Sequence, residues 1–252
     1  MLNYTVHKMT GNCILHIIEL DKIDSQFSTC LDSYLVSICE GESDSELYLV
    51  KKRLLDFLLS KSDEIKMGAI AELLVHLYLN MNDFKQEFLF FNLEEKSIKK
   101  GFDGIFTKNS EKFLVESKSG AKGKVNVNHK YKLKLAYTDL SSYVSGDSEK
   151  GKNNPWRNAY NHASHLDVST EKSIREKLKI LANSFDQGSY TSINDYHIVP
   201  CSTIFLNSSW STEESKSILD DNLFIKEFKG LSVNALCITK SSLENFIKYL
   251  EV

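Results

Sequence analysis

Apolar residues follow two different periods along the first eighty residues, and each period predicts one type of element. The run CILHIIEL at 13–20 is short and apolar, as in a buried strand. Residues 27–39 and 47–61, separated by the turn EGESDSE, have the composition of two helices. Residues 64–81 are apolar nearly all round, which predicts a helix buried within a domain. Glu72 lies in that helix, and Gly68 one turn earlier is expected to let it approach a sheet closely.

Three strand-like runs follow the buried helix, at 85–93, 101–107 and 113–119, and the turn-rich KNSEK separates the last two. A helix is predicted at 131–144 and a polar loop at 145–156. An amphipathic helix then places four apolar residues on one face: Ile174, Leu178, Leu181 and Phe185.

Two more strands are predicted near the end of the chain, at 196–206 and 231–239. Each precedes a helix with a capping-box signature, Ser211 with Glu214 and Ser241 with Glu244. The hairpin at 101–119 cannot be parallel, so the sheet must be partly antiparallel. We therefore expect a mixed α/β fold with a central mixed sheet flanked by helices, comprising an N-terminal strand and helix elaboration at 1–60 and a main domain at 61–252.

Composition narrows the class of protein. The 252 residues are 42% hydrophobic and 26% charged, enough for one substantial core. No apolar run approaches the roughly 20 residues of a membrane span, and the start lacks the order of a signal peptide, so a cytoplasmic location is expected. Five scattered cysteines without a C-x-x-C pair indicate reduced thiols. No P-loop, nucleophile-elbow or dinucleotide-binding glycine pattern occurs.

The predicted hairpin brings two carboxylates together. A turn centred on 109 and 110 pairs Thr107 with Lys112, and the same register places Asp103 opposite Glu116. Opposed side chains share a face, with their Cβ atoms about 5 Å apart. Two like charges at that spacing require a cation, and Lys118 lies on the same face, two residues after Glu116.

The rest of the hairpin is apolar on both faces. Ile105 and Leu114 share the face of the charged residues, and the other face holds Phe102, Phe106, Phe113 and Val115. The pattern leaves two interpretations open: a structural ion pair at a strand end, or a site in which a divalent cation completes the cluster. A cluster of acidic oxygens and a lysine around a hard cation suits phosphodiester hydrolysis.

These residues resemble the PD-(D/E)xK nuclease superfamily, whose core runs helix, three strands, helix, strand. The resemblance implies a restriction-endonuclease-like core and a Mg²⁺ or Mn²⁺ cofactor. Phe102 stands where the motif has its proline. The implied roles are metal ligation by Asp103, Glu116 and the carbonyl of Ser117, catalysis by Lys118, and auxiliary support from Glu72.

Longer segments have a narrower resemblance. GAIAELLVHLYL, KGFDGIF, FLVESKSG and YHIVPCSTIFL are similar to the HamA-type nuclease subunit of the Hachiman anti-phage defence system. That resemblance implies a superfamily 2 helicase partner that governs access to DNA. The expected function is a metal-dependent DNA nuclease acting as the effector of such a complex. The alternatives are a stand-alone restriction endonuclease and a non-catalytic nucleic-acid-binding subunit.

Lysines accumulate directly after the hairpin, where no acidic residue occurs between Glu116 and Asp139. Such a run either contacts the phosphate backbone of a nucleic acid or forms a solvated stretch. Its predicted phosphate contacts are Lys122, Lys124, Lys130 and Lys132. Two further features stay open: Trp156 stacks on a base or anchors a loop, and the pair His162 and His165 binds metal or is structural.

Overall fold

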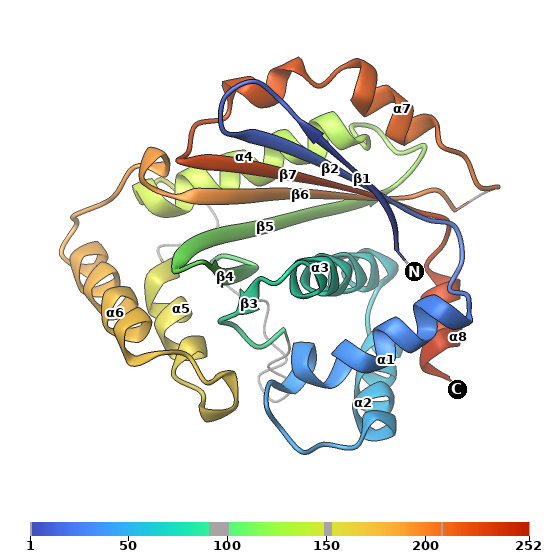
Figure 1. Cartoon of the computed structure of the whole chain (residues 1–252), viewed down its shortest axis with the longest axis horizontal. Helices are drawn as coiled ribbons and strands as arrows, with labels where there is room; N and C mark the ends of the chain where they lie inside the picture. The colour runs from blue at the N-terminus through green and yellow to red at the C-terminus, as the bar shows by residue number, and fades with distance from the viewer. Residues whose placement is uncertain (1, 91–100, 149–152, 208, 252) are drawn as a thin grey trace.

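The computed structural model describes residues 2–90, 101–148, 153–207 and 209–251 (Figure 1). Within these residues seven strands form one sheet in the order β1-β2-β7-β6-β5-β4-β3. The four strands β2, β7, β6 and β5 are mutually parallel, and β1, β4 and β3 pair antiparallel to their neighbours. The strands are β1 (Asn3–Lys8), β2 (Cys13–Leu20), β3 (Lys85–Gln86), β4 (Gly104–Lys108), β5 (Glu111–Ala121), β6 (His197–Phe205) and β7 (Ser232–Lys240).

Helices cover both faces of the sheet, as the sequence predicts for a mixed α/β fold. The α-helices are α1 (Ser25–Glu40), α2 (Leu47–Leu59), α3 (Asp63–Met81), α4 (His129–Ser145), α5 (Pro155–Ala163), α6 (Lys172–Asp186), α7 (Glu213–Asp220) and α8 (Glu244–Leu250). Short 3₁₀ turns occupy Leu166–Val168, Ile193–Asp195 and Leu223–Glu227.

Two hydrophobic cores lie on opposite faces of the sheet. One joins α1, α2, α3 and α8 to the face that carries Val115, and the other joins α4, α5 and α6 to the face that carries Leu114. Figure 1 shows α3 on one side of β5 and α4 on the other. Because successive side chains of a strand point to opposite faces, Glu116 and Lys118 lie on the face of Leu114, beneath α4.

The first sixty residues are built into the same sheet and core as the remainder of the described chain. β2 lies between β1 and β7, and Leu31 and Val50 belong to the same core as α3. The sequence pattern missed β1 because most of its side chains are exposed. It also missed α5, which begins at Pro155, inside the predicted polar loop; residues 149–152 of that loop lie outside the described residues.

Three predicted details need correction. The strand-like run at 85–93 contains only the two-residue β3, and its last residues lie outside the described part. α7 and α8 form as predicted, but Thr212 and Leu243 are their N-cap residues, so neither predicted capping box exists. The hydroxyl of Ser241 donates instead to the carbonyl of Asp21.

The predicted hairpin register is confirmed. β4 and β5 pair Thr107 with Lys112, and the pairing continues to Gly104 with Val115. The two turn residues Asn109 and Ser110 have φ of 51° and 66°, the left-handed values that a tight two-residue hairpin requires. Phe102 does not lie on the face of Phe106, Phe113 and Val115 as predicted. It precedes the strand, and its ring packs against Trp156 on the α4 side of the sheet.

The close approach of α3 to the sheet occurs at Gly104 and not at Gly68. A Cβ built at Gly68 would meet nothing within 4 Å, so the expectation for that glycine is wrong. A Cβ at Gly104 would lie 2.9 Å from the ring of Phe106 and 3.4 Å from His76 Nε2. Glycine at this position therefore lets α3 pack against the start of β4.

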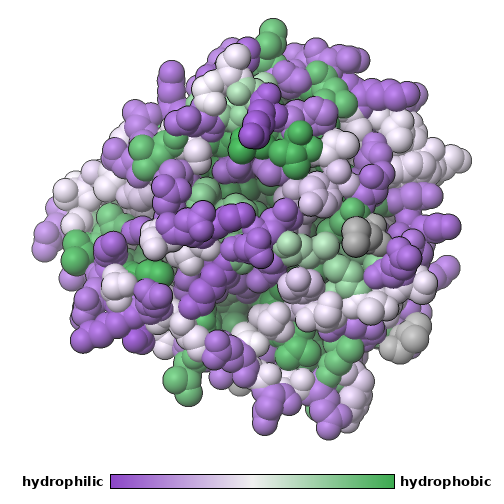
Figure 2. Space-filling view, in the orientation of Figure 1, coloured by the Kyte–Doolittle hydropathy of each residue, from purple (hydrophilic) through white to green (hydrophobic). Residues whose placement is uncertain are grey.

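The surface in the orientation of Figure 1 carries many polar side chains. Figure 2 shows a mostly hydrophilic face with apolar patches scattered over it. None of the helices in the described residues combines the length and the apolar composition that a membrane crossing needs. The five cysteines are free thiols, as the sequence predicts.

Candidate active site

Glu116 is the buried centre of the candidate site. Its side chain points from the middle of β5 toward α4 and is 2% exposed. Its Oε1 accepts a short hydrogen bond from Lys118 Nζ. Its Oε2 is buried without a hydrogen-bond partner among the described residues. An unpaired carboxylate oxygen in a buried place costs free energy of folding. A bound ligand or a proton on this oxygen would remove that cost.

Asp103 lies beside Glu116, just outside the β4–β5 ladder. Its backbone N–H donates to the carbonyl of Val115 (3.1 Å), which continues the hairpin by one bond. Its carboxylate Oδ2 accepts a hydrogen bond from the backbone N–H of Ser117 (2.6 Å). The carboxylate is therefore tied across the hairpin to the residue that follows Glu116, so its position depends on the register.

Lys118 connects the hairpin to α4. Its Nζ lies 2.8 Å from Asp139 Oδ2, and its side chain is 21% exposed, so the cluster opens to solvent on this side. Sequence reasoning missed Asp139, because no hairpin argument places a helix residue. One signal was present: Asp139 lies directly beside a buried stripe of α4 formed by Leu133, Ala136, Leu140 and Tyr143.

Burial and mutual repulsion shape the charges of the cluster. Burial raises the pKa of the Glu116 carboxyl well above its usual range, and the nearby charge of Asp103 raises it further. Burial alone would lower the pKa of Lys118, but the surrounding carboxylates outweigh it and raise that pKa. Lys118 therefore stays an ammonium ion, while Glu116 has the more readily protonated carboxylate.

Tyr143 adds a hydroxyl next to the carboxylates. It lies one helical turn after Asp139 on α4, and its ring packs edge-to-face against Phe102. Burial raises the pKa of its hydroxyl, and the charges of Glu116 and Asp139 add to that rise. The hydroxyl is therefore a neutral hydrogen-bond donor at the wall of the site.

The residues of the cluster fit a hard divalent cation. Among the described residues no group of three or more His, Cys, Asp or Glu side chains is arranged to hold a metal ion. Mg²⁺, however, commonly binds through one or two carboxylates and keeps several waters. Asp103, Glu116 with its unpaired Oε2, and the carbonyl of Ser117 are oxygen ligands of that kind. They are the residues that would hold Mg²⁺ or Mn²⁺.

Glu72 approaches the hairpin from the other face. It lies half-buried on α3, and His76, one turn further along the helix, contacts the start of β4 at Gly104. Asp103 directly precedes Gly104, whereas the side chain of Glu116 points away from α3 toward α4. The role of Glu72 as an auxiliary glutamate stays a prediction.

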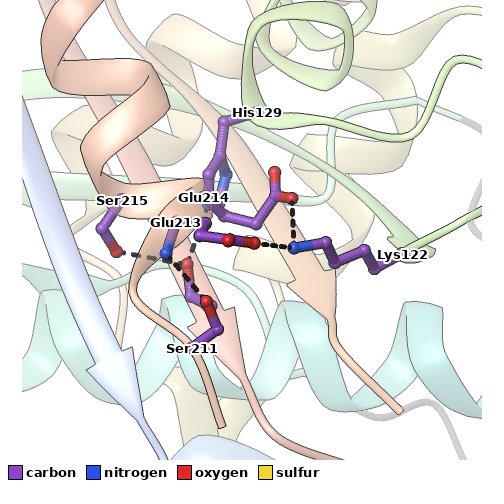
Figure 3. A network of polar contacts seen from close by, with 7 residues as sticks. Lys122, His129, Ser211, Glu213, Glu214 and Ser215 are labelled. Atoms are coloured by element: carbon purple, nitrogen blue, oxygen red, sulfur yellow. Dashed lines mark hydrogen bonds and ion pairs between the residues drawn. The ribbon is translucent and has the colours of Figure 1, made fainter. Parts of the chain in front are cut away.

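Lys122 lies in a network of polar contacts near the start of α7 (Figure 3). Its Nζ is 2.9 Å from Glu213 Oε2 and 3.4 Å from Glu214 Oε1. These pairs raise its pKa, mainly through the hydrogen bond to Glu213. Two carboxylates thus neutralise a lysine that the sequence predicts as a phosphate contact.

Two other lysines of the run are also paired. Lys124 lies 3.2 Å from Glu64 at the start of α3, and Lys130 lies 2.7 Å from Asp221 after α7. Such exposed pairs contribute little to stability and are weakened by salt. A polyanion can displace the carboxylates from these lysines, but it then gains less binding free energy than it would from unpaired lysines.

Lys132 lies close to Lys118 and so to the carboxylate cluster. Its Cε would be 3.1 Å from a Cβ built at Gly120, so it lies across β5 beyond Lys118. Burial lowers its pKa, and the positive charge of Lys118 lowers it further. Within the described residues it forms no ion pair. It is the strongest of the four predicted phosphate contacts.

His129 joins α4 to the sheet beside the cluster (Figure 3). Its Nδ1 is 2.9 Å from Ser202 Oγ, and its Nε2 is 3.0 Å from Thr239 Oγ1. Ser202 is the cross-strand neighbour of Lys118 on β6. Burial lowers the pKa of His129 to about 3, so the ring is neutral at neutral pH. This network holds the beginning of α4 in place.

Trp156 and the histidine pair have structural surroundings. Trp156 is buried between the rings of Phe102 and Tyr196, so it anchors α5 and is not exposed for base stacking. His162 stacks on Phe88, and the rings of His162 and His165 are 6.4 Å apart. These contacts favour the structural interpretation of both features.

Comparison with known protein families finds no matching family model, and a search of curated proteins finds no significant match.

Proposed function

We propose that this protein is a divalent-metal-dependent DNA nuclease whose active site is formed by the β4–β5 hairpin and α4. The observation that carries the proposal is the pair of neighbouring carboxylates, Asp103 and Glu116, with the Lys118 ammonium beside them. Two acidic oxygens and a fixed cation at one buried spot suit phosphodiester hydrolysis better than they suit a structural ion pair.

Each residue has a distinct role in the proposed reaction. Asp103, Glu116 and the Ser117 carbonyl would hold the cation. Mg²⁺ held there would supply polarisation of a phosphate oxygen and activation of water. Lys118, charged in its carboxylate surroundings, stabilises the negative charge that develops on the phosphate in the transition state.

The resemblance of the chain to a defence-system nuclease subunit supports the biological setting of the proposal. In that setting the protein is cytoplasmic and acts with a helicase subunit that controls its access to DNA. The paired state of Lys122, Lys124 and Lys130 agrees with such control, because it limits the free positive surface next to the site.

A test of the proposal uses supercoiled plasmid DNA. The wild-type chain with Mg²⁺ is expected to nick or linearise the plasmid, alone or with a co-purifying helicase, and EDTA is expected to stop the reaction. Glu116→Ala should remove this activity. Glu111→Ala, at the exposed start of the same strand, should keep it. Equal behaviour of the wild type and Glu116→Ala in every mixture would refute the assignment of the site.

A stand-alone restriction endonuclease is the second candidate, since it needs the same cluster. Cleavage at one short sequence without any partner, giving a discrete band pattern, would favour it. A non-catalytic nucleic-acid-binding subunit would bind DNA and cleave it under none of these conditions.

Lys132→Ala is expected to weaken DNA binding more than Lys130→Ala does. Lys132 forms no ion pair within the described residues, whereas Asp221 already neutralises Lys130. The logarithm of the binding constant plotted against the logarithm of salt concentration should lose about 0.9 of slope for Lys132→Ala. The two variants can be compared by fluorescence anisotropy in Ca²⁺, which is a common non-catalytic substitute. Equal losses of DNA affinity and salt slope in the two variants would mean that the ion pair with Asp221 does not reduce the contribution of Lys130 to DNA binding.

A further inference from the structure

Lys118 lies between carboxylates from two different elements. Glu116 belongs to its own strand, and Asp139 comes from α4, with Oδ2 2.8 Å from Nζ. The side chains of the two acids are 2% and 15% exposed, so water screens neither pair strongly. The hairpin register explains why Glu116 lies beside Lys118, but it does not explain why Asp139, on α4, also contacts this lysine.

The two carboxylates cannot have the same role once a cation is bound. A divalent cation on Glu116 competes with the Lys118 ammonium for that carboxylate. An ammonium that loses its partner in a mostly buried site either acquires another anion or swings out to solvent. Asp139 is already in contact with it.

We propose that Asp139 is a positioning residue that holds the Lys118 ammonium in the site when Glu116 binds the metal. This inference rests on the proposed nuclease function. It adds a residue on α4 whose effect on the reaction passes through Lys118, since its Oδ2 is already occupied by that ammonium.

α4 is well suited to this task because it is fixed along its length. Asn128 caps its first turn by accepting from the backbone N–H of Tyr131 (2.8 Å), and Gly146 ends it with φ of 75°. His129 ties its beginning to β6 and β7, and Leu140 is fully buried next to Asp139. Asp139 is therefore presented from a rigid element.

The first test measures how strongly the Lys118 ammonium is held in its ion pairs, without any need for catalysis. Wild type, Asp139→Asn and Asp139→Glu are treated with an amine-acetylating reagent in saturating Mn²⁺, and labelling is quantified by mass spectrometry. Asp139→Asn should label Lys118 at least about fivefold faster than the wild type, and Asp139→Glu should stay within about twofold of it. Equal labelling in all three chains overturns the proposal.

Two controls separate this effect from unfolding. Asp221→Asn breaks another aspartate–lysine pair and should leave Lys118 labelling unchanged. Lys240, which is fully buried, reports unfolding by becoming labelled. If Asp139→Asn exposes Lys240, Asp139→Ser takes its place, and a folded serine variant with wild-type labelling of Lys118 overturns the proposal.

The second test follows cleavage at increasing Mg²⁺. Asp139→Asn should lower the rate at saturating Mg²⁺ by about 10- to 100-fold, with the half-saturating concentration within about threefold of the wild type. Asp139→Glu should recover most of the rate. A large rise in the half-saturating concentration would make Asp139 a metal ligand and overturn the proposal. A wild type that never cleaves DNA refutes the nuclease function, and the labelling result still decides the role of Asp139.

Discussion

Lys118→Met is expected to slow metal-dependent DNA cleavage by at least about 10³-fold while binding Mn²⁺ at least as tightly as the wild type. The loss follows from the removal of the fixed cation that faces the reacting phosphate. The preserved affinity follows from competition, because Lys118 Nζ hydrogen-bonds Oε1 of the same carboxylate whose unpaired Oε2 a metal would use. Methionine has a similar length but no charge, so it fills the space without competing.

The prediction is checked by plasmid cleavage and by calorimetric Mn²⁺ titration at pH 8, where Glu116 is more readily ionised than at neutral pH. Lys112→Met is the matched control, because Lys112 lies on the same strand near the turn and has no role in the proposed site. A Lys118→Met chain that cleaves within tenfold of the wild type would exclude Lys118 as the catalytic lysine. A chain that loses Mn²⁺ binding would show that the lysine supports metal binding and does not compete with it.

Acid is expected to destabilise the protein through His129. The pKa of this histidine is lowered from 6.5 to about 3 by burial, so the unfolded chain binds a proton more readily than the folded chain does. The stabilising contribution is complete above pH 6.5 and is lost progressively as the pH falls toward 3. Between pH 6.5 and 5 the free energy of unfolding should fall by about 1.6 kcal/mol from this residue.

Urea unfolding at pH 7, 6 and 5 measures this slope. His129→Gln should be less stable at pH 7, because a buried hydrogen-bonded ring is lost, but its stability should depend less on pH. His16, whose pKa burial lowers to about 4, contributes in the same direction and leaves a residual slope. His165→Gln, which changes an exposed ring, should keep the wild-type slope. Identical slopes for His129→Gln and the wild type would contradict the account.

The hairpin could be predicted from sequence because its determinants are local. The side chains of Ile105 and Leu114 point to one face of the sheet, and those of Phe106 and Phe113 point to the other. With the turn at Asn109 and Ser110, one register buries all four. In that register Asp103 lies beside Glu116, and Lys118 lies on the same face as Glu116. The end of the hairpin was less predictable, because Phe102 and Asp103 lie before the strand and follow a loop conformation.

The contributions of α4 could not be predicted because they depend on packing between distant segments. The position of Asp139 beside the buried stripe of α4 indicates a polar partner, but nothing near it in the chain identifies that partner as Lys118, twenty-one residues earlier. The ion pairs of Lys122 and Lys130 with residues around α7 have the same origin, since each joins groups ninety-one residues apart. A lysine run in the sequence therefore indicates more free positive charge than the folded chain presents.

If Asp103 and Glu116 form a binding site for one divalent cation, calorimetric titration with Mn²⁺ will detect it. The wild-type chain is expected to bind one Mn²⁺, and Asp103→Asn is expected to weaken that binding at least about tenfold while keeping the fold. Asp147→Asn, an exposed aspartate after α4, should bind as the wild type does. A wild-type chain that binds no Mn²⁺, or an Asp103→Asn chain that binds it equally well, would show that these carboxylates do not form a metal site.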